Sequence, residues 1–403
     1  MRHGQQRTIP MTNTPKAKLS ALTGLRFVAA LHVVLGHEAQ WLFEDCAALV
    51  RSDPVSSIFG VNATQFVAEL IGNLAFTGRS SVSLFFVLSG FILAYNYRDT
   101  LGKSVALPEF YRMRFARIYP VYLLAFLMVL PFVVARILTE TELPGDATRR
   151  GLLNLILIQS WYPPDSLSWN APAWSLSVEM FFYASFPFLL GPILSAPRRT
   201  ALCCAVFFCV ATQIGVGFGK VHTGEAAPDW YAFFSNFPLL RLSEFTLGIA
   251  LIRLLPEGHP LPVGHVVAGH PLTLLLAGVA CVLAVGWKSD GLGEVVRGVM
   301  LPLCFAWLIY CLALGPADRV LGCAPMTLLG EASYALYITH EALLPYFETI
   351  KRRVTGDPDL GKPLRLTFVL AAIAFSVLVL KWLETPARKG LVKWFSRTKT
   401  TLG

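Results

Sequence analysis

The chain has 403 residues, of which 55% are hydrophobic and only 15% charged, and its formal net charge is +9. This composition is far more apolar than that of soluble domains, so it excludes a soluble protein. The positive charge would suit a nucleic-acid partner, but the Lys and Arg residues cluster at the ends of apolar runs, where membrane topology places them. We therefore predict an all-α, polytopic integral membrane protein whose partner is the lipid bilayer, not nucleic acid.

Apolar windows of about 20 residues, the length that crosses a bilayer as a helix, recur along the whole chain. They cover residues 22–43, 80–97, 118–138, 173–195, 200–218, 236–255, 271–287, 296–314, 326–347 and 365–384. One further apolar segment, 152–162, is too short, and Pro163 and Pro164 follow it directly. We expect about ten transmembrane helices plus this short segment, which is re-entrant or interfacial.

Basic residues test this count, because cytoplasmic segments are enriched in Lys and Arg. They concentrate in the N-terminal tail, the loop 98–117 and the C-terminal tail, and ten spans put all three on one side. Both termini are therefore expected in the cytoplasm. The loop that carries Lys351, Arg352 and Arg353 falls on the opposite side and goes against the rule. The predicted organisation is an N-terminal tail, 1–20, a membrane domain, 21–388, and a basic C-terminal tail, 389–403.

The first apolar run contains two ionisable residues, Arg26 and His37, eleven positions apart. In a helix this spacing puts both side chains on one face, roughly 16 Å apart along the axis. Ionisable groups inside membrane helices are costly and usually functional. We expect Arg26 to hold a charged molecule near the cytoplasmic end and His37 to perform proton chemistry deeper in. A snorkelling cation and a hydrogen-bonded bundle residue are the structural alternative, and His32, on another face, is expected to be structural.

The loop before the third span enters it with Arg114 and Arg117, at positions i and i+3. These side chains share a helix face and can hold one anion together. Aromatic residues are interleaved with them and would suit a stacked planar group. Taken alone, the segment is explained equally well by positive-inside anchoring with interfacial aromatics.

The segment 169–183 places Ser177, Glu179 and Tyr183 at the start of the fourth span. A carboxylate at this point can orient an imidazole or balance its charge, as the third member of many base systems does. The structural alternative is a glutamate that caps the helix start.

Two later spans also carry ionisable residues. Arg241 and Glu244 are at i and i+3, which fits a structural ion pair as well as a substrate contact. His340 and Glu341 lie in the middle of the span 326–347, where the cost of burial makes them candidates to line a site. The histidines and cysteines show no zinc-type spacing, so no metal site is predicted.

These residues fall in motifs that resemble the membrane acyltransferase-3 family. In chain order the motifs are Arg26 with His37, Ser83-Leu-Phe-Phe-Val-Leu-Ser-Gly-Phe-Ile92, Arg114-Phe-Ala-Arg-Ile-Tyr-Pro120, Trp174-Ser-Leu-Ser-Val-Glu179 with Tyr183, and Ser333-Tyr-Ala-Leu-Tyr337 with His340. The resemblance runs from about Leu22 to Arg388. Two positions depart from the family pattern: Met180 replaces a second polar residue after Glu179, and Glu341 stands where many relatives have an apolar or aromatic residue.

The resemblance implies a membrane O-acyltransferase of the bacterial cytoplasmic (inner) membrane, because the family is bacterial and O-acylates carbohydrates or, in some members, macrolides. The donor would be cytoplasmic acyl-CoA, expected to be acetyl-CoA, the acceptor a carbohydrate or macrolide-like hydroxyl, and no cofactor would be permanently bound. Arg26, Arg114 and Arg117 would bind the donor. His37 would act as general base or acyl carrier, oriented by Glu179. The other expected site-lining residues are Ser177, Tyr183, Arg241, Glu244, His340 and Glu341. A transporter or flippase of a glycan or small molecule is the alternative, since it also needs about ten spans with buried charges.

Overall fold

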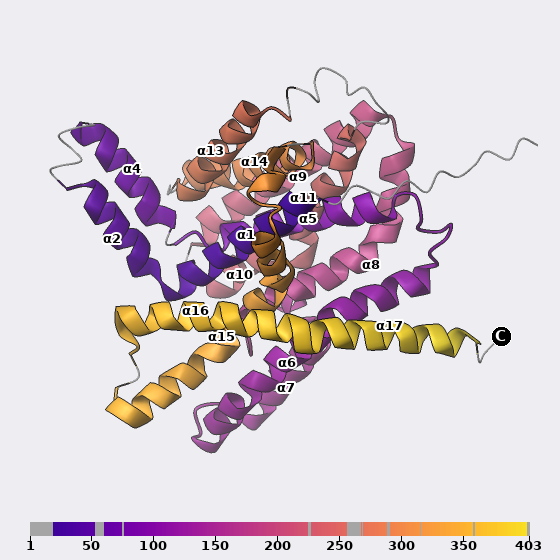
Figure 1. Ribbon diagram of the computed structural model, residues 1–403. Helices are drawn as coiled ribbons and strands as arrows, with labels where there is room; N and C mark the ends of the chain where they lie inside the picture. The colour runs from indigo at the N-terminus through magenta and orange to yellow at the C-terminus, as the bar shows by residue number, and fades with distance from the viewer. Residues whose placement is uncertain are drawn as a thin grey trace, which may run out of the picture.

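A computed structural model of the chain describes residues 19–52, 60–74, 76–224, 227–255, 267, 269–287, 291–314, 316–357 and 359–400. The regular structure of these residues is helical (Figure 1), which confirms the predicted all-α class. The α-helices are α1 (Ser20–Glu38), α2 (Gln40–Val50), α4 (Val61–Leu74), α5 (Ser80–Tyr97), α6 (Leu107–Leu138), α7 (Pro144–Leu155), α8 (Trp174–Ser195), α9 (Arg198–Thr223), α10 (Pro228–Asn236), α11 (Pro238–Leu251), α13 (Pro271–Gly286), α14 (Leu292–Leu314), α15 (Ala324–Thr355), α16 (Gly361–Val379) and α17 (Thr385–Thr400). The predicted N-terminal tail lies almost entirely outside the described residues.

Seven helical segments of the described chain are long and apolar enough to cross a membrane. They are Ser20–Glu38, Ser80–Tyr97, Leu107–Leu138, Ala171–Ser195, Arg198–Thr223, Leu292–Leu314 and Gly361–Trp394. Each of the ten predicted spans overlaps a helix, but α11 and α13 have only 14 and 16 residues. α15 is long, yet it carries Glu331, Glu341 and Glu348 along its length. The multi-pass character of the protein is therefore supported, whereas the count of ten spans is not confirmed.

The first predicted span, 22–43, is not a single helix. α1 ends at Glu38, Ala39 leaves the helical conformation (φ −139°, ψ 39°), and α2 begins at the next residue. The side-chain amide of Gln40 donates a 2.8 Å hydrogen bond to the carbonyl of Gly36, which satisfies an acceptor that a helix end leaves free. The break places His37 in the last turn of α1 instead of deep within a longer span, and it lets α2 and α4 pack together to one side of the body (Figure 1).

The short apolar segment 152–162 consists of the last residues of α7 and a turn of 3₁₀ helix. In this turn the side chains of Gln159 and Ser160 are buried and donate hydrogen bonds to the carbonyls of Ala173 (3.0 Å) and Trp174 (2.8 Å). The segment therefore forms no spanning helix. It packs against the start of α8 and fixes the position of that helix.

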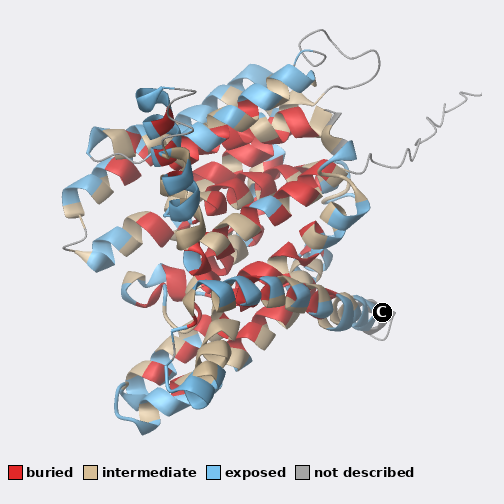
Figure 2. Cartoon of the chain, turned by 60° about the vertical axis from the view of Figure 1, so that its left-hand side comes forward, coloured by how far each residue is buried: buried red, intermediate tan, exposed pale blue. Residues whose placement is uncertain are grey.

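Two helix pairs form the centre of the fold, α1 with α15 and α5 with α11. Both pairs approach closely at glycine residues. A Cβ on Gly330 of α15 would overlap the carbonyl oxygen of Thr23, and a Cβ on Gly248 of α11 would overlap that of Val87. Small residues at such crossings are a common means of helix packing in membranes. Buried residues concentrate in the middle of the molecule, and exposed ones lie on its periphery (Figure 2).

The C-terminal helices form one continuous rod, drawn in yellow in Figure 1. A π-helical segment, Leu380–Glu384, joins α16 to α17, and α17 packs against α6. Glu384 points inward and is 1% exposed. Such π-helical turns frequently occur at functional sites. Much of the predicted basic C-terminal tail thus belongs to a helix that lies along the body of the protein.

Candidate functional site

The two ionisable residues of α1 lie in different surroundings. Arg26 lines a large cavity, whereas His37 contacts side chains of α15. Their spacing of eleven positions separates the two places by roughly 16 Å along the helix axis. α1 therefore connects two distinct parts of a candidate site.

The cavity around Arg26 has a volume of about 720 Å³ and is rich in positive charge. Three segments that are distant in the sequence supply its six basic side chains. These are Arg26 from α1, Arg114 and Arg117 from α6, and Arg388, Lys389 and Lys393 from α17. We call this space the basic cavity. It brings together the three arginines that the sequence predicts to bind the donor, and α17 adds three cations that the sequence does not predict there.

Glu179 of α8 is the carboxylate that lines the basic cavity. Its Oε1 accepts a hydrogen bond from the hydroxyl of Tyr183 (2.6 Å) and a longer one from Ser89 (3.4 Å). It also interacts electrostatically with Arg26. The predicted contact between Glu179 and His37 is therefore wrong, because α8 brings this carboxylate to the Arg26 end of α1.

The guanidinium of Arg114 is held among aromatic rings. It donates a 3.1 Å hydrogen bond to the hydroxyl of Tyr97 and lies 5.4 Å from the centroid of that ring and 5.8 Å from that of Tyr183. Cations in such positions are attracted by the ring faces. Tyr97 of α5 and Tyr183 of α8 thus hold Arg114 at the cavity that it lines.

Arg117 has a different neighbour. Its Nη1 lies 3.9 Å from Oε1 of Glu384 in the π-helical segment, which is too long for a hydrogen bond. Oε2 of Glu384 has no hydrogen-bond partner among the described residues. The buried Glu384 carboxylate therefore offsets part of the positive charge without being locked to one arginine.

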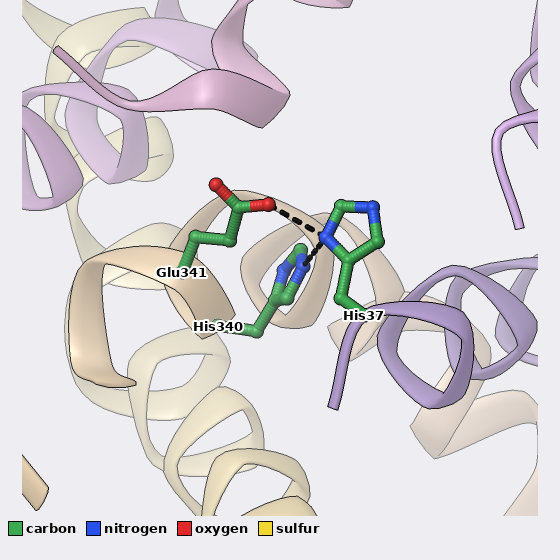
Figure 3. Close-up of side chains that lie close together, drawn as sticks. All are labelled: His37, His340 and Glu341. Carbon is green, nitrogen blue, oxygen red and sulfur yellow. Dashed lines mark hydrogen bonds and ion pairs between the residues drawn. The ribbon is translucent and has the colours of Figure 1, made fainter. Parts of the chain in front are cut away.

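At the other end of α1, His37 forms a cluster with His340 and Glu341 of α15 (Figure 3). Nδ1 of His37 lies 2.6 Å from Oε1 of Glu341 and 3.4 Å from Nε2 of His340. His340 is fully buried, and its Nδ1–H donates a 2.8 Å hydrogen bond to the carbonyl of Tyr337. That bond leaves the Nε2 of His340 as an acceptor that faces His37.

This geometry distinguishes the two ring nitrogens of His37. When Nδ1–H donates to the Glu341 carboxylate, Nε2 carries the free lone pair. The His37 side chain is 30% exposed, so Nε2 is within reach of another molecule. A carboxylate that orients an imidazole in this way is the arrangement found in many base-assisted acyl transfers.

Two imidazoles and a carboxylate are also a possible set of zinc ligands, and their donor atoms lie within 4.8 Å of one another. In a tetrahedral site with ligand bonds of about 2.0–2.2 Å, neighbouring donor atoms are roughly 3.3 Å apart. The 2.6 Å between Nδ1 of His37 and Oε1 of Glu341 is shorter and is typical of a charge-assisted hydrogen bond. We therefore interpret the cluster as a hydrogen-bonded group.

Of the remaining predicted residues, Arg241 and Glu244 line a second cavity, whereas Ser177 is buried and lines neither cavity. Nη1 of Arg241 lies 3.2 Å from Oε1 of Glu244, which confirms their ion pair, and both line a second, smaller cavity. Ser177 is buried, and its hydroxyl accepts a 3.3 Å hydrogen bond from the backbone N–H of Ser160. It lines neither cavity, so its contact is one of packing. His32 is hydrogen-bonded to Ser81 and to a backbone carbonyl, as expected of a structural residue.

Comparisons with known proteins show which family the chain resembles. The model of an acyltransferase-3 family, described as an acyltransferase domain, matches residues 19–383. The chain is 32% identical to acyltransferase MdmB of Streptomyces mycarofaciens, over 82% of this chain and 80% of that protein. It is 27% identical to the exopolysaccharide production protein ExoZ of Rhizobium meliloti, over 68% and 78% of the two chains. It is 26% identical to the putative peptidoglycan O-acetyltransferase YrhL of Bacillus subtilis, over 81% of this chain but only 53% of that protein. No solved structure matches.

Proposed function

Because the chain belongs to the membrane acyltransferase-3 family, we propose that this multi-pass enzyme moves an acyl group, acetyl in the first instance, from acyl-CoA to a hydroxyl of a carbohydrate or glycosylated acceptor. One observation carries the proposal. A single helix, α1, presents Arg26 to the basic cavity and His37 to a carboxylate–imidazole cluster at its other end. The alternative of a transporter or flippase is set aside, because the family is one of acyltransferases.

The basic cavity is proposed as the donor site. Coenzyme A carries phosphate groups, and arginine holds phosphate through paired hydrogen bonds. The volume of about 720 Å³ lies within the usual range of cofactor and ligand sites. Arg114 and Arg117 would hold the phosphates together with Arg26, and the basic side chains of α17 would extend the contact.

The orientation of the molecule follows from the same charges. The loop 98–117 and the C-terminal segment supply most cations of the basic cavity, and cytoplasmic segments are enriched in such residues. We therefore place the basic cavity and both termini on the cytoplasmic side of a bacterial inner membrane. The pantetheine arm would then extend along the roughly 16 Å from Arg26 toward His37.

In the proposed reaction, Nε2 of His37 removes the proton of the acceptor hydroxyl as its oxygen attacks the thioester carbonyl carbon. Glu341 stabilises the imidazolium that forms. The carbon–sulfur bond then breaks, and the leaving coenzyme A sulfur takes the proton from His37, so that the products are the acyl ester and the free thiol. In a second possible route, Nε2 attacks the thioester itself and carries the acyl group to the acceptor.

The test is acyl transfer by purified protein in lipid nanodiscs, with labelled acetyl-CoA as donor and cell-envelope glycans or secreted metabolites as acceptors. Mass spectrometry of these fractions from cells with and without the gene identifies the acceptor and the acyl group together. We expect transfer by the wild type and a loss of at least about 100-fold in a His37→Gln variant. The matched control is His32→Gln, on another face of α1, which should retain activity. Full activity in folded His37→Gln protein would contradict the proposed base.

A further inference from the structure

The second cavity lies at the start of α5, at the opposite end of that helix from the basic cavity. Its volume is about 150 Å³, and Ser80 and Ser83 of α5 line it, whereas Ser89 and Asn96 line the basic cavity. We call it the mixed-charge cavity. A 2.8 Å hydrogen bond between His32 and Ser81 ties this end of α5 to the half of α1 that carries His37. The mixed-charge cavity is thus on the same side of the molecule as the histidine cluster.

The mixed-charge cavity holds more positive than negative charge. Its lining includes Arg79, Lys220, Arg241 and Arg297 but only two carboxylates, Glu244 and Glu294. Arg241 pairs with Glu244 (3.2 Å), and Arg297 pairs with Glu294 (2.7 Å).

Two cations of this cavity are left without a carboxylate. Arg79 donates a 2.9 Å hydrogen bond to the neutral amide oxygen of Asn236, and Lys220 lies 5.5 Å from the centroid of the Tyr231 ring. Neither forms an ion pair within the part of the chain that the structure describes. Because each carboxylate of the cavity already has a partner, Arg79 and Lys220 are available to an anionic ligand.

Two buried oxygen atoms of the same cavity also lack partners. Among the described residues, Oε2 of Glu244 and Oγ of Ser235 form no hydrogen bond, although the two residues are only 1% and 3% exposed. A buried polar atom without a partner costs free energy. Both residues line the mixed-charge cavity, so a ligand there that bears hydroxyl groups would bring hydrogen-bonding groups close to a carboxylate that accepts and a serine that can donate or accept.

The mixed-charge cavity is connected to the catalytic cluster through a few contacts. The guanidinium of Arg79 lies 5.9 Å from the centroid of the Trp174 ring. Ser175, the residue after Trp174, donates a 3.0 Å hydrogen bond to the hydroxyl of Tyr337. The ring centroid of Tyr337 is 6.3 Å from that of His340. Arg79 also interacts electrostatically with Glu341. Arg79 is therefore linked to the cluster that contains His37 through Trp174, Ser175 and Tyr337, and it lies within electrostatic range of Glu341.

We infer that the mixed-charge cavity is the acceptor subsite and that it takes an anionic, hydroxyl-bearing group, namely a single acidic sugar residue. This inference rests on the proposed function, of which it names the acceptor class. The volume of about 150 Å³ is below the range of about 300 Å³ and more that drug-sized ligands need. The cavity therefore fits one sugar unit, whose hydroxyl then extends toward His37, and it is too small for a whole macrolide ring.

The test is binding of two matched probes, methyl glucuronide and methyl glucoside, to the full chain in nanodiscs of neutral phosphatidylcholine. We expect the glucuronide to bind at least about tenfold more tightly, since its carboxylate gains charge-assisted hydrogen bonds. Arg79→Gln, which keeps a donor for Asn236, and Lys220→Gln should each remove most of this preference. The control Arg353→Gln removes an exposed cation of α15 and should retain the preference.

Equal binding of the two probes, or an unchanged preference in both cavity variants, would overturn the inference. Inorganic phosphate serves as a third probe. If it binds as tightly as the glucuronide and displaces it, the cavity recognises an anion alone, and the sugar assignment is wrong. The assay separates this inference from the proposed function. A glucuronide preference without any acyl transfer would contradict only the function, whereas transfer to neutral acceptors at an unchanged rate in Arg79→Gln would contradict only the acceptor class.

Discussion

The two ends of α1 organise charge in opposite ways. At the Arg26 end, six cations from α1, α6 and α17 line an open cavity of about 720 Å³, in which Glu179 is the one carboxylate of the described lining. At the His37 end, the ionisable groups contact one another directly, with 2.6 Å between Nδ1 of His37 and Oε1 of Glu341. Charges that face an open cavity are available to an incoming anion, whereas a paired imidazole is held in one orientation.

Because its two ends differ in this way, one helix can serve both anion binding and proton transfer. Binding a polyanion requires positive charge that remains unpaired until the ligand arrives. Proton transfer requires a base whose tautomer and direction are fixed before the reaction. The comparison therefore predicts that substitutions at the His37 end lower kcat, while substitutions at the Arg26 end raise the KM for the donor.

After His37 itself, the largest effect is expected for Glu341→Gln, which keeps the shape of the side chain but removes the charge that orients His37. We expect kcat to fall by about 100-fold with little change in donor KM, because general-base catalysis contributes about 10²–10⁴-fold. The matched substitution Glu179→Gln, in the basic cavity, should act mainly on donor KM. Steady-state kinetics with labelled acetyl-CoA checks both variants. If Glu179→Gln instead lowers kcat and Glu341→Gln raises the donor KM, Glu179 is the partner of His37, and the two ends of α1 do not have the separate roles described above.

A smaller effect is expected when Arg114 and Arg117 are both replaced by Ala. Losing two charge-assisted contacts to phosphate should raise the KM for acetyl-CoA by about 30-fold and leave kcat within about threefold. The control is Lys103→Ala, which removes a cation from the same loop outside the cavity lining. An unchanged donor KM in the double variant would show that these arginines only anchor the loop in the membrane surface.

The smallest effect concerns Glu384, which weakens the positive charge of the basic cavity from 3.9 Å away from Arg117. Replacing it by Gln should lower the donor KM by about threefold, the size expected for one partly screened ion contact. Because the basic cavity becomes more positive, the KM should also rise more steeply with salt. Measurements of donor KM at low and high ionic strength check this prediction. A higher KM would instead show that Glu384 holds Arg117 in its binding position.

Predictions from the sequence were correct where local residue patterns determine the structure. Apolar windows located helices throughout the chain, and the spacing of Arg114 and Arg117 placed both in one cavity. The predicted first span, 22–43, runs five residues past the end of α1 at Glu38, because hydropathy does not register the break at Ala39. The apolar window 326–347 correctly located α15, but this helix carries Glu331, Glu341 and Glu348 and is not among the seven that are apolar enough to cross a membrane.

Contacts between distant segments could not be predicted in the same way. His37 and His340 are 303 residues apart, and no periodicity reports which helices will pack together. Glu179 and Glu341 are both carboxylates in apolar helices, so only the packing of α15 along α1 decides which one reaches His37.

Tertiary contacts also account for basic residues that oppose the positive-inside rule. Lys351 pairs with Asp357, Lys362 with Asp45, and Arg365 with Glu38. These ion pairs offset part of the positive charge of the loop that the ten-span topology places outside, a compensation that charge counting along the chain cannot detect.

We propose that donor binding and proton transfer are separated along α1. The decisive experiment measures both properties in one His37→Gln variant, coenzyme A binding by calorimetry and acetyl transfer by product formation. The account predicts a dissociation constant within about twofold of the wild type together with a loss of transfer of at least about 100-fold. Retained transfer, or a loss of coenzyme A binding in parallel with activity, would contradict it.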